Sequence, residues 1–130
     1  MSSPIQQALD KAKEIGTVKT EGLRMAQAKK DVRLKLFIAV ADRDLKCKGC
    51  GYPWTISGPR FDAHHITDRH EMPNGGNVLE NLIFLCPKCH WKAEAYHRNE
   101  DPEDGFWPDQ LYELIGSSYE KAVAASERLQ

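Results

Sequence analysis

The feature that most constrains this chain is a pair of C-x-x-C segments. All four of its cysteines lie in them, in Cys47-Lys48-Gly49-Cys50 and Cys86-Pro87-Lys88-Cys89. Each such turn can direct two thiolates at one ion, and four thiolates close a tetrahedral zinc site that leaves no position open for a substrate. We therefore predict a structural Zn²⁺ held by Cys47, Cys50, Cys86 and Cys89. Any catalysis must then take place elsewhere.

Two alternatives use the same cysteines: redox-active pairs and disulfides. Residues 1–10 have neither the basic start nor the apolar core of a secretory signal, which favours reduced thiols and a cytoplasmic location. The chain also lacks the βαβ pattern that accompanies redox C-x-x-C motifs. The longest apolar stretch, residues 34–41, is interrupted by Lys35 and is far shorter than the roughly 20 residues of a bilayer span. We expect no membrane segment.

Composition and charge place broad limits on the class of protein. The 130 residues are 41% hydrophobic and 28% charged, as expected for one folded domain. The net charge of −1 averages two unlike parts: residues 1–98 hold 16 Lys and Arg against 11 Asp and Glu, whereas residues 99–130 hold 2 against 8. A mildly basic body with an acidic tail fits a phosphate-binding face, although proteins without a polyanionic partner often carry as much charge.

The local patterns predict helices at both ends and a hairpin between them. Residues 4–15 and 20–43 are rich in helix formers, and the second segment should pack through Leu34, Phe37, Ile38 and Ala41. Residues 61–66 and 81–85 have strand character, with a Gly75-Gly76 turn between them. Pro87 suits the first position of a helix that runs to Arg98, and Pro108 opens a final helix with a stripe of Leu111, Ile115, Tyr119 and Val123.

The histidines gather in one part of the chain. Four of the five lie between residues 64 and 90, at His64, His65, His70 and His90. Neighbouring side chains on a strand point to opposite faces, so His64 and His65 are expected to do different jobs.

The order of these motifs resembles that of HNH endonucleases of the four-cysteine kind. The resemblance covers about residues 47–97 and rests on Asp62-Ala63-His64-His65-Ile66, Gly75-Gly76, Glu80-Asn81-Leu82-Ile83 and Cys86-Pro87-Lys88-Cys89-His90. It implies an α+β fold, with a small ββα-metal core and its four-cysteine zinc clamp in residues 47–98. N-terminal helices in residues 1–46, and an acidic linker with a C-terminal helix in residues 99–130, would flank this core within a single domain.

The resemblance also implies a role for each site residue. His65 would be the general base, His64 and His90 would hold a catalytic divalent metal, and Asn81 would tie down the long loop of the hairpin. Glu94 stands where many members of the family carry a further histidine, so it is a candidate third ligand. A histidine first ligand favours Zn, Mn, Co or Ni, although Mg can serve where water and phosphate complete the shell.

These roles imply a metal-dependent endonuclease that nicks or cuts DNA. Basic residues near the site are candidates for contacts with the DNA backbone: Arg60, Arg69, Lys88, Lys92 and Arg98. Trp54 and Trp91 flank the cysteine turns, and we expect both to pack around the zinc site. The alternative is a noncatalytic zinc-ribbon module that binds nucleic acid or a protein, but such a module has no need of His64, His65, Asn81 and His90 in this order.

Overall fold

The computed structural model describes residues 18–129, which fall into two compact units that divide between Lys35 and Leu36. Helix α2 (Val18–Asp44) crosses this division and confirms the helix predicted over residues 20–43. The helix predicted over residues 4–15 lies outside the described residues. Within residues 18–129, no helix combines the length and the apolar character that a membrane span requires.

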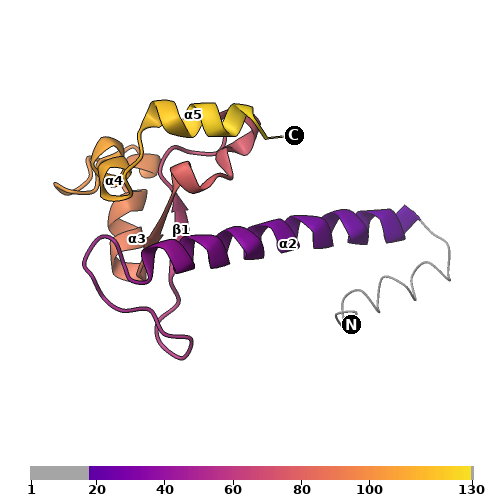
Figure 1. Cartoon of the computed structure of the whole chain (residues 1–130), viewed down its shortest axis with the longest axis horizontal. Coiled ribbons are helices and arrows are strands. Elements are labelled where there is room, and N and C mark those ends of the chain that lie inside the picture. The colour runs from indigo at the N-terminus through magenta and orange to yellow at the C-terminus, as the bar shows by residue number, and fades with distance from the viewer. Residues whose placement is uncertain (1–17, 130) are drawn as a thin grey trace. The chain divides into compact units, whose positions relative to one another are not determined.

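The second unit is built on a two-stranded antiparallel hairpin followed by a helix (Figure 1). Strand β1 (Asp62–His65) pairs with β2 (Leu82–Leu85), so that Asp62 lies opposite Leu85 and His65 lies opposite Leu82. Helix α3 (Pro87–Glu94) begins directly after β2, with Pro87 at its first position, and it contacts both strands. The predicted α+β class and the strand, loop, strand, helix order are confirmed.

The hydrophobic core lies around β2, whose four residues are all buried. Phe84 on this strand is surrounded by aromatic rings, with centroids 5.0 Å from Phe61, 5.5 Å from Phe37 and 5.8 Å from Trp54. Trp54 therefore packs against the core, which includes three of the four cysteines. Trp91 does not pack around the zinc site as predicted, because it is 67% exposed and lies under the guanidinium of Arg98 at 3.9 Å.

The end of α2 packs on this core through only part of the predicted stripe. Phe37 and Ala41 pack on the core as predicted, but Leu34 and Ile38 are 58% and 50% exposed. Val40 is buried as well, and Asp44 takes the next position on the buried face. The Asp44 carboxylate accepts a hydrogen bond from the backbone N–H of Phe84 at 3.0 Å and one from Arg43 Nε at 2.7 Å. A buried charge is tolerated when it is paired in this way, and a pattern based on hydrophobicity does not include it.

The C-terminal segment forms two helices, so the single final helix predicted from Pro108 is wrong. Helix α4 (Pro108–Leu114) ends before Gly116, whose φ of +67° reverses the chain, and α5 (Tyr119–Glu127) starts anew with the Ser118 side chain accepting from the N–H of Lys121 at 3.1 Å. Leu111 is buried while Tyr119 is 49% exposed, so the predicted stripe is not one face. Helix α3 likewise stops at Glu94 and continues to Arg98 only as the 3₁₀ turn η3 (Tyr96–Arg98).

The loop between the strands contains two 3₁₀ turns, η1 (Pro73–Gly76) and η2 (Leu79–Asn81), and α5 packs against both. Gly76 at the end of η1 has a φ of +66° and is buried. A Cβ atom there would lie 2.8 Å from Asn81 Nδ2 and 2.9 Å from the Met72 side chain. The loop can therefore approach Asn81 only because this residue has no side chain.

Replacing Gly76 with alanine is expected to destabilise the protein more than the same change at Gly116. The two glycines have nearly the same φ, but no atom of the described residues lies within 4 Å of a Cβ atom at Gly116. Both variants incur the left-handed backbone penalty, and only Gly76→Ala adds overpacking, worth about 1–3 kcal/mol. Urea unfolding of the two variants measures the difference, and equal losses would show that the loop does not need this close approach.

Candidate active site and zinc cluster

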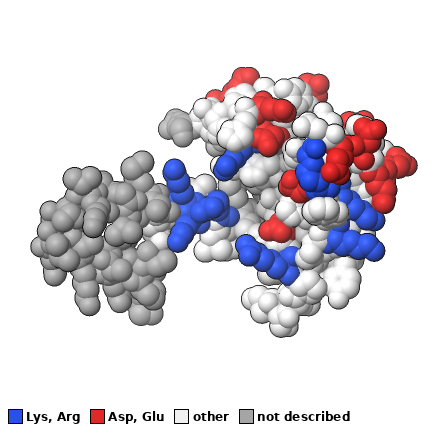
Figure 2. All heavy atoms as spheres, turned by 180° about the vertical axis from the view of Figure 1, so that it is seen from behind, with Lys and Arg blue, Asp and Glu red and all other residues white. Residues whose placement is uncertain are grey.

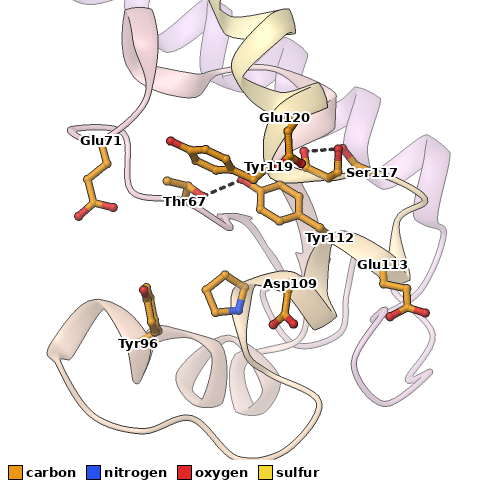
Figure 3. Close-up of a pocket in the computed structure, with 11 residues that line it drawn as sticks. Thr67, Glu71, Tyr96, Asp109, Tyr112, Glu113, Ser117, Tyr119 and Glu120 are labelled. Carbon is orange, nitrogen blue, oxygen red and sulfur yellow. Dashed lines mark hydrogen bonds between the residues drawn. The ribbon is translucent and has the colours of Figure 1, made fainter.

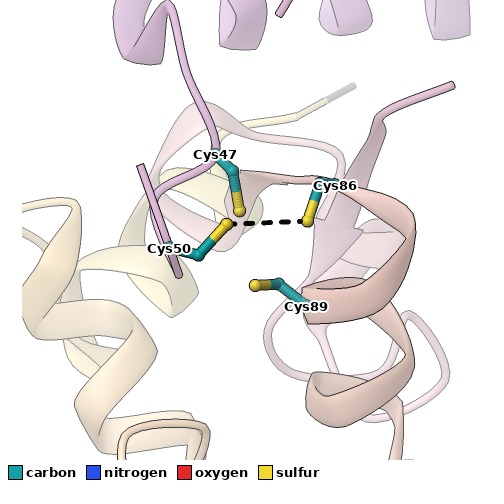
Figure 4. A group of neighbouring side chains, drawn as sticks. All are labelled: Cys47, Cys50, Cys86 and Cys89. Carbon is teal, nitrogen blue, oxygen red and sulfur yellow. Dashed lines mark hydrogen bonds between the residues drawn. The ribbon is translucent and has the colours of Figure 1, made fainter. Parts of the chain in front are cut away.

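The four cysteines converge on one point from two turns, as predicted (Figure 4). Cys47 and Cys50 follow α2, and Cys86 and Cys89 lie at the start of α3. Their sulfur atoms lie within 4.8 Å of one another, with Cys50 Sγ 3.8 Å from Cys86 Sγ, and all four cysteines are free. Zn–S bonds of about 2.3 Å in a tetrahedron place the sulfurs about 3.8 Å apart. The cluster is thus positioned for zinc.

The electrostatics of the cluster also suit a cation. Burial raises the pKa of Cys47, but nearby backbone N–H groups, first that of Cys86, more than offset this and lower its pKa to about 7. Burial raises the pKa values of Cys86 and Cys89. A bound cation would ionise these buried thiols, as metal ions do for coordinating thiols generally.

A second group of metal-binding side chains is formed by His64 on β1 with His90 and Glu94 on α3. Their ligand atoms lie within 4.8 Å of one another. Glu94 Oε1 lies between the two imidazoles, 3.1 Å from His64 Nδ1 and 3.0 Å from His90 Nε2. Since residues 90 and 94 are one helical turn apart, α3 presents both toward the buried His64 ring. The structure therefore brings the three predicted metal ligands together, Glu94 included.

This group carries the charges that a cation-binding site needs. Hydrogen bonding to His64, supported by the other nearby imidazoles, lowers the pKa of Glu94 to about 2, so the carboxylate is ionised at neutral pH. Burial lowers the pKa of His64, which keeps its imidazole neutral. His64 Nε2 is also a buried polar atom without a hydrogen-bond partner among the described residues. Two imidazoles and one carboxylate form a donor set suited to a transition metal.

The group of His64, His90 and Glu94 opens into a pocket. The pocket has a volume of about 310 Å³ and is lined by residues of β1, of the loop after it and of the α3 region: Asp62, Ala63, His64, His65, Asp68, Arg69, His90, Glu94 and His97. His65 therefore lines the same pocket as the metal-ligand group. His64 and His65 are neighbours on a strand, where successive side chains point to opposite faces, but both line this pocket. The candidate base and the candidate metal ligands thus share one solvent-accessible space.

His65 is half-buried and has two specific contacts. Its Nε2 lies 2.8 Å from Asn77 Oδ1, and its backbone carbonyl accepts a hydrogen bond from His97 Nε2 at 3.0 Å. By contrast, His70 is exposed, and its backbone N–H is bonded to the Asp68 side chain at 2.8 Å. His70 does not line the pocket.

Asn81 is fully buried and holds the loop through four hydrogen bonds. Its Oδ1 accepts from the Thr67 N–H at 3.0 Å and from the Tyr112 hydroxyl at 2.7 Å, and its Nδ2 donates to the carbonyls of Thr67 at 3.1 Å and Gly76 at 3.2 Å. The Tyr112 hydroxyl also accepts from Thr67 Oγ1 at 2.7 Å (Figure 3). Asn81 therefore ties both ends of the loop together, with α4 as a support.

Three residues of this site were missed by sequence reasoning: Asp62, Asn77 and Tyr112. Asp62 Oδ2 lies 3.2 Å from His90 Nδ1, where it can orient the ring so that Nε2 faces Glu94. A signal for Asp62 was available, because it precedes His64 by two residues and so shares its face of the strand. No local pattern marks Asn77 or Tyr112, whose roles depend on how the loop and α4 fold back.

The basic residues predicted to contact DNA are not gathered in one place. Arg69 lines the pocket, whereas Arg60 and Lys88 are exposed outside it. Lys92 forms an ion pair with Glu103 at 3.0 Å, and Arg98 pairs with Glu100 at 3.4 Å while it covers Trp91. Figure 2 shows acidic side chains beside the basic ones on the face it presents. A second pocket of about 480 Å³ is rich in carboxylates and tyrosines and does not suit a phosphate backbone.

Residues 47–95 match the family model described as HNH endonuclease. This part of the chain is therefore an HNH endonuclease domain with a four-cysteine cluster positioned for zinc, which confirms the resemblance inferred from the motifs. Members of the family are typically nucleases that use a divalent metal, and the family implies a nucleic-acid substrate. No curated protein and no solved structure matches the chain.

Proposed function

We propose that this protein is a metal-dependent endonuclease that hydrolyses DNA phosphodiester bonds, with His65 as the general base. The observation that carries the proposal is the pocket that brings His65 together with His64, His90 and Glu94. A purely structural zinc module needs only the cysteine cluster. The second group of donors opens into this pocket and includes the ionised Glu94 carboxylate, so it offers a cation a site apart from the cysteines.

The residues that line the pocket would have different roles in the reaction. His65 takes a proton from the attacking water, because an imidazole nitrogen with a free lone pair can accept one. His64, His90 and Glu94 would hold a divalent metal, and Asp62 orients His90. A metal bound there supplies positive charge for the phosphate oxygens and the leaving oxygen. Arg69 lines the same pocket and can contact a non-bridging phosphate oxygen.

We expect an exchangeable divalent metal at His64, His90 and Glu94, separate from tightly held zinc on the cysteines. Glu94→Gln should weaken Mn²⁺ binding by about tenfold or more, because even the indirect supporters of metal ligands contribute about 10- to 100-fold. Isothermal titration with Mn²⁺, after the second site has been cleared by dialysis, measures this affinity. Glu100→Gln is the matched control, since Glu100 is an exposed carboxylate that pairs with Arg98.

A crystal soak tests the two-site proposal alongside the titration. Crystals soaked in Mn²⁺ should show the ion beside Glu94, at a position that also contacts both imidazoles. Density at the cysteines alone, or equal affinity in Glu94→Gln and wild type, would refute the second site. Strong DNA binding without cleavage in any divalent metal would instead support the noncatalytic zinc-ribbon alternative.

A further inference from the structure

Asn77 is the side chain that contacts the imidazole of His65. Its Oδ1 lies 2.8 Å from His65 Nε2. Asn77 lies in the loop between the strands, directly after η1, and is half-buried. The contact therefore crosses from the middle of the loop to the end of β1, over a separation of 12 residues.

The chemistry of this contact selects one form of the histidine. An amide oxygen only accepts hydrogen bonds, so His65 Nε2 must carry the proton that it donates to Asn77 Oδ1. In a neutral imidazole the other nitrogen, Nδ1, then holds the free lone pair. The same hydrogen bond fixes the rotation of the ring, because turning the ring over would place a carbon against the amide oxygen.

The position of Asn77 is set by the residue before it. The carbonyl of Gly76 accepts a hydrogen bond from Asn81 Nδ2 at 3.2 Å, and the φ of +66° at Gly76 directs the chain into Asn77. Asn81 has no direct hydrogen bond to His65. A continuous path instead runs from Asn81 through the Gly76 backbone to Asn77 and from there to His65.

We propose that Asn77 is a positioning residue, which holds His65 with Nε2 protonated and Nδ1 facing the substrate water. This inference rests on the proposed function, in which His65 is the general base. Asn77 touches neither substrate nor metal in this account. The buried Asn81 supports it by holding, through the Gly76 carbonyl, the loop segment from which Asn77 reaches the histidine.

Asn77→Ala should lower kcat for plasmid cleavage by about 10- to 100-fold, since a misplacement of a catalytic group by about 1 Å costs about 100-fold. KM, DNA affinity at fixed salt, zinc content and the circular dichroism spectrum should stay unchanged. Asn77→Asp keeps an acceptor oxygen at the same position and should restore most of kcat. A purely structural role for Asn77 would not produce this separation of kcat from KM together with rescue by aspartate.

Asn74→Ala is the matched control in the same loop. Asn74 Nδ2 donates to the carbonyls of Ser126 at 3.0 Å and Leu129 at 3.2 Å, and the residue has no hydrogen bond to His65. Its loss should lower the melting temperature and leave kcat near wild type. Equal kcat losses in Asn74→Ala and Asn77→Ala would overturn the proposal in favour of general loop loosening.

Two further outcomes separate this inference from the proposed function. If His65→Ala is inactive while Asn77→Ala keeps the wild-type kcat, the positioning role is refuted and the proposed function stands. If His65→Ala cleaves DNA at the wild-type rate, both are refuted.

Discussion

Replacing His65 with alanine is expected to lower the rate of DNA cleavage by about 10² to 10⁴-fold, the usual contribution of general acid–base catalysis. The side chain is half-buried at the edge of the pocket and is not part of the hydrophobic core, so folding should be retained. Zinc content should also stay unchanged, because His65 does not belong to the cysteine cluster. Single-turnover cleavage of supercoiled plasmid in saturating Mn²⁺ measures the effect.

His70→Ala is the matched control for this experiment. His70 lies five residues further along the chain but is exposed and does not line the pocket. Its replacement should leave cleavage near the wild-type rate. DNA affinity must be compared at one salt concentration, since phosphate contacts make binding steeply salt-dependent. A His70→Ala variant that loses activity, beside a fully active His65→Ala, would move the base to His70.

The parts of the fold that sequence could predict depend on short spacings. The two C-x-x-C turns specify the cysteine cluster because each turn already holds its own two sulfur atoms close together. The fold then has only to bring one turn against the other. The turn of helix between His90 and Glu94 likewise places both side chains on one face. The hairpin follows from two short segments of strand character with a glycine-containing loop between them, at residues 61–66 and 81–85.

The errors arise where tertiary contacts replace local preference. Trp91 was expected to pack around the zinc site, but α3 turns that face to solvent, and Arg98 covers the ring instead. The stripe on α2 shifts because Asp44 is buried through hydrogen bonds to Phe84 and Arg43, which hydrophobic periodicity does not register. The final helix breaks at Gly116, where the segment Gly116-Ser117-Ser118 was a signal for a helix end and a new helix cap.

The site residues that belong to the HNH motif could be predicted from the sequence, because His64, His65, Asn81 and His90 occur in the order of that motif. The residues that support them are not part of the motif. Asn77 and Tyr112 reach the site from the loop and from α4, so that only the folded chain shows their contacts. Such residues have no fixed spacing from the ones they support, because the intervening loop sets the distance.

The zinc cluster has the largest expected effect on stability, because its binding energy is comparable to the stability of a whole domain. Structural zinc sites contribute about 10–16 kcal/mol near neutral pH, whereas a typical domain is stable by about 5–15 kcal/mol. Here Cys47 and Cys89 are 0% and 3% exposed and belong to the hydrophobic core. The metal would therefore fix the segment after α2 to the start of α3, the helix that carries His90 and Glu94.

We therefore expect Cys47→Ser combined with Cys86→Ser to abolish zinc binding and to unfold the domain, while the wild type retains about one zinc per chain. Elemental analysis after dialysis gives the metal content, and circular dichroism with thermal melting gives the fold. His90→Ala combined with Glu94→Ala is the control, because it removes two ligands of the other group, both only half-buried, and should keep both zinc and fold. A double-serine variant that stays folded with the wild-type melting temperature would mean that the zinc cluster does not hold the domain together. If the wild type yields no free thiols when it is denatured without reductant, the disulfide alternative would be supported.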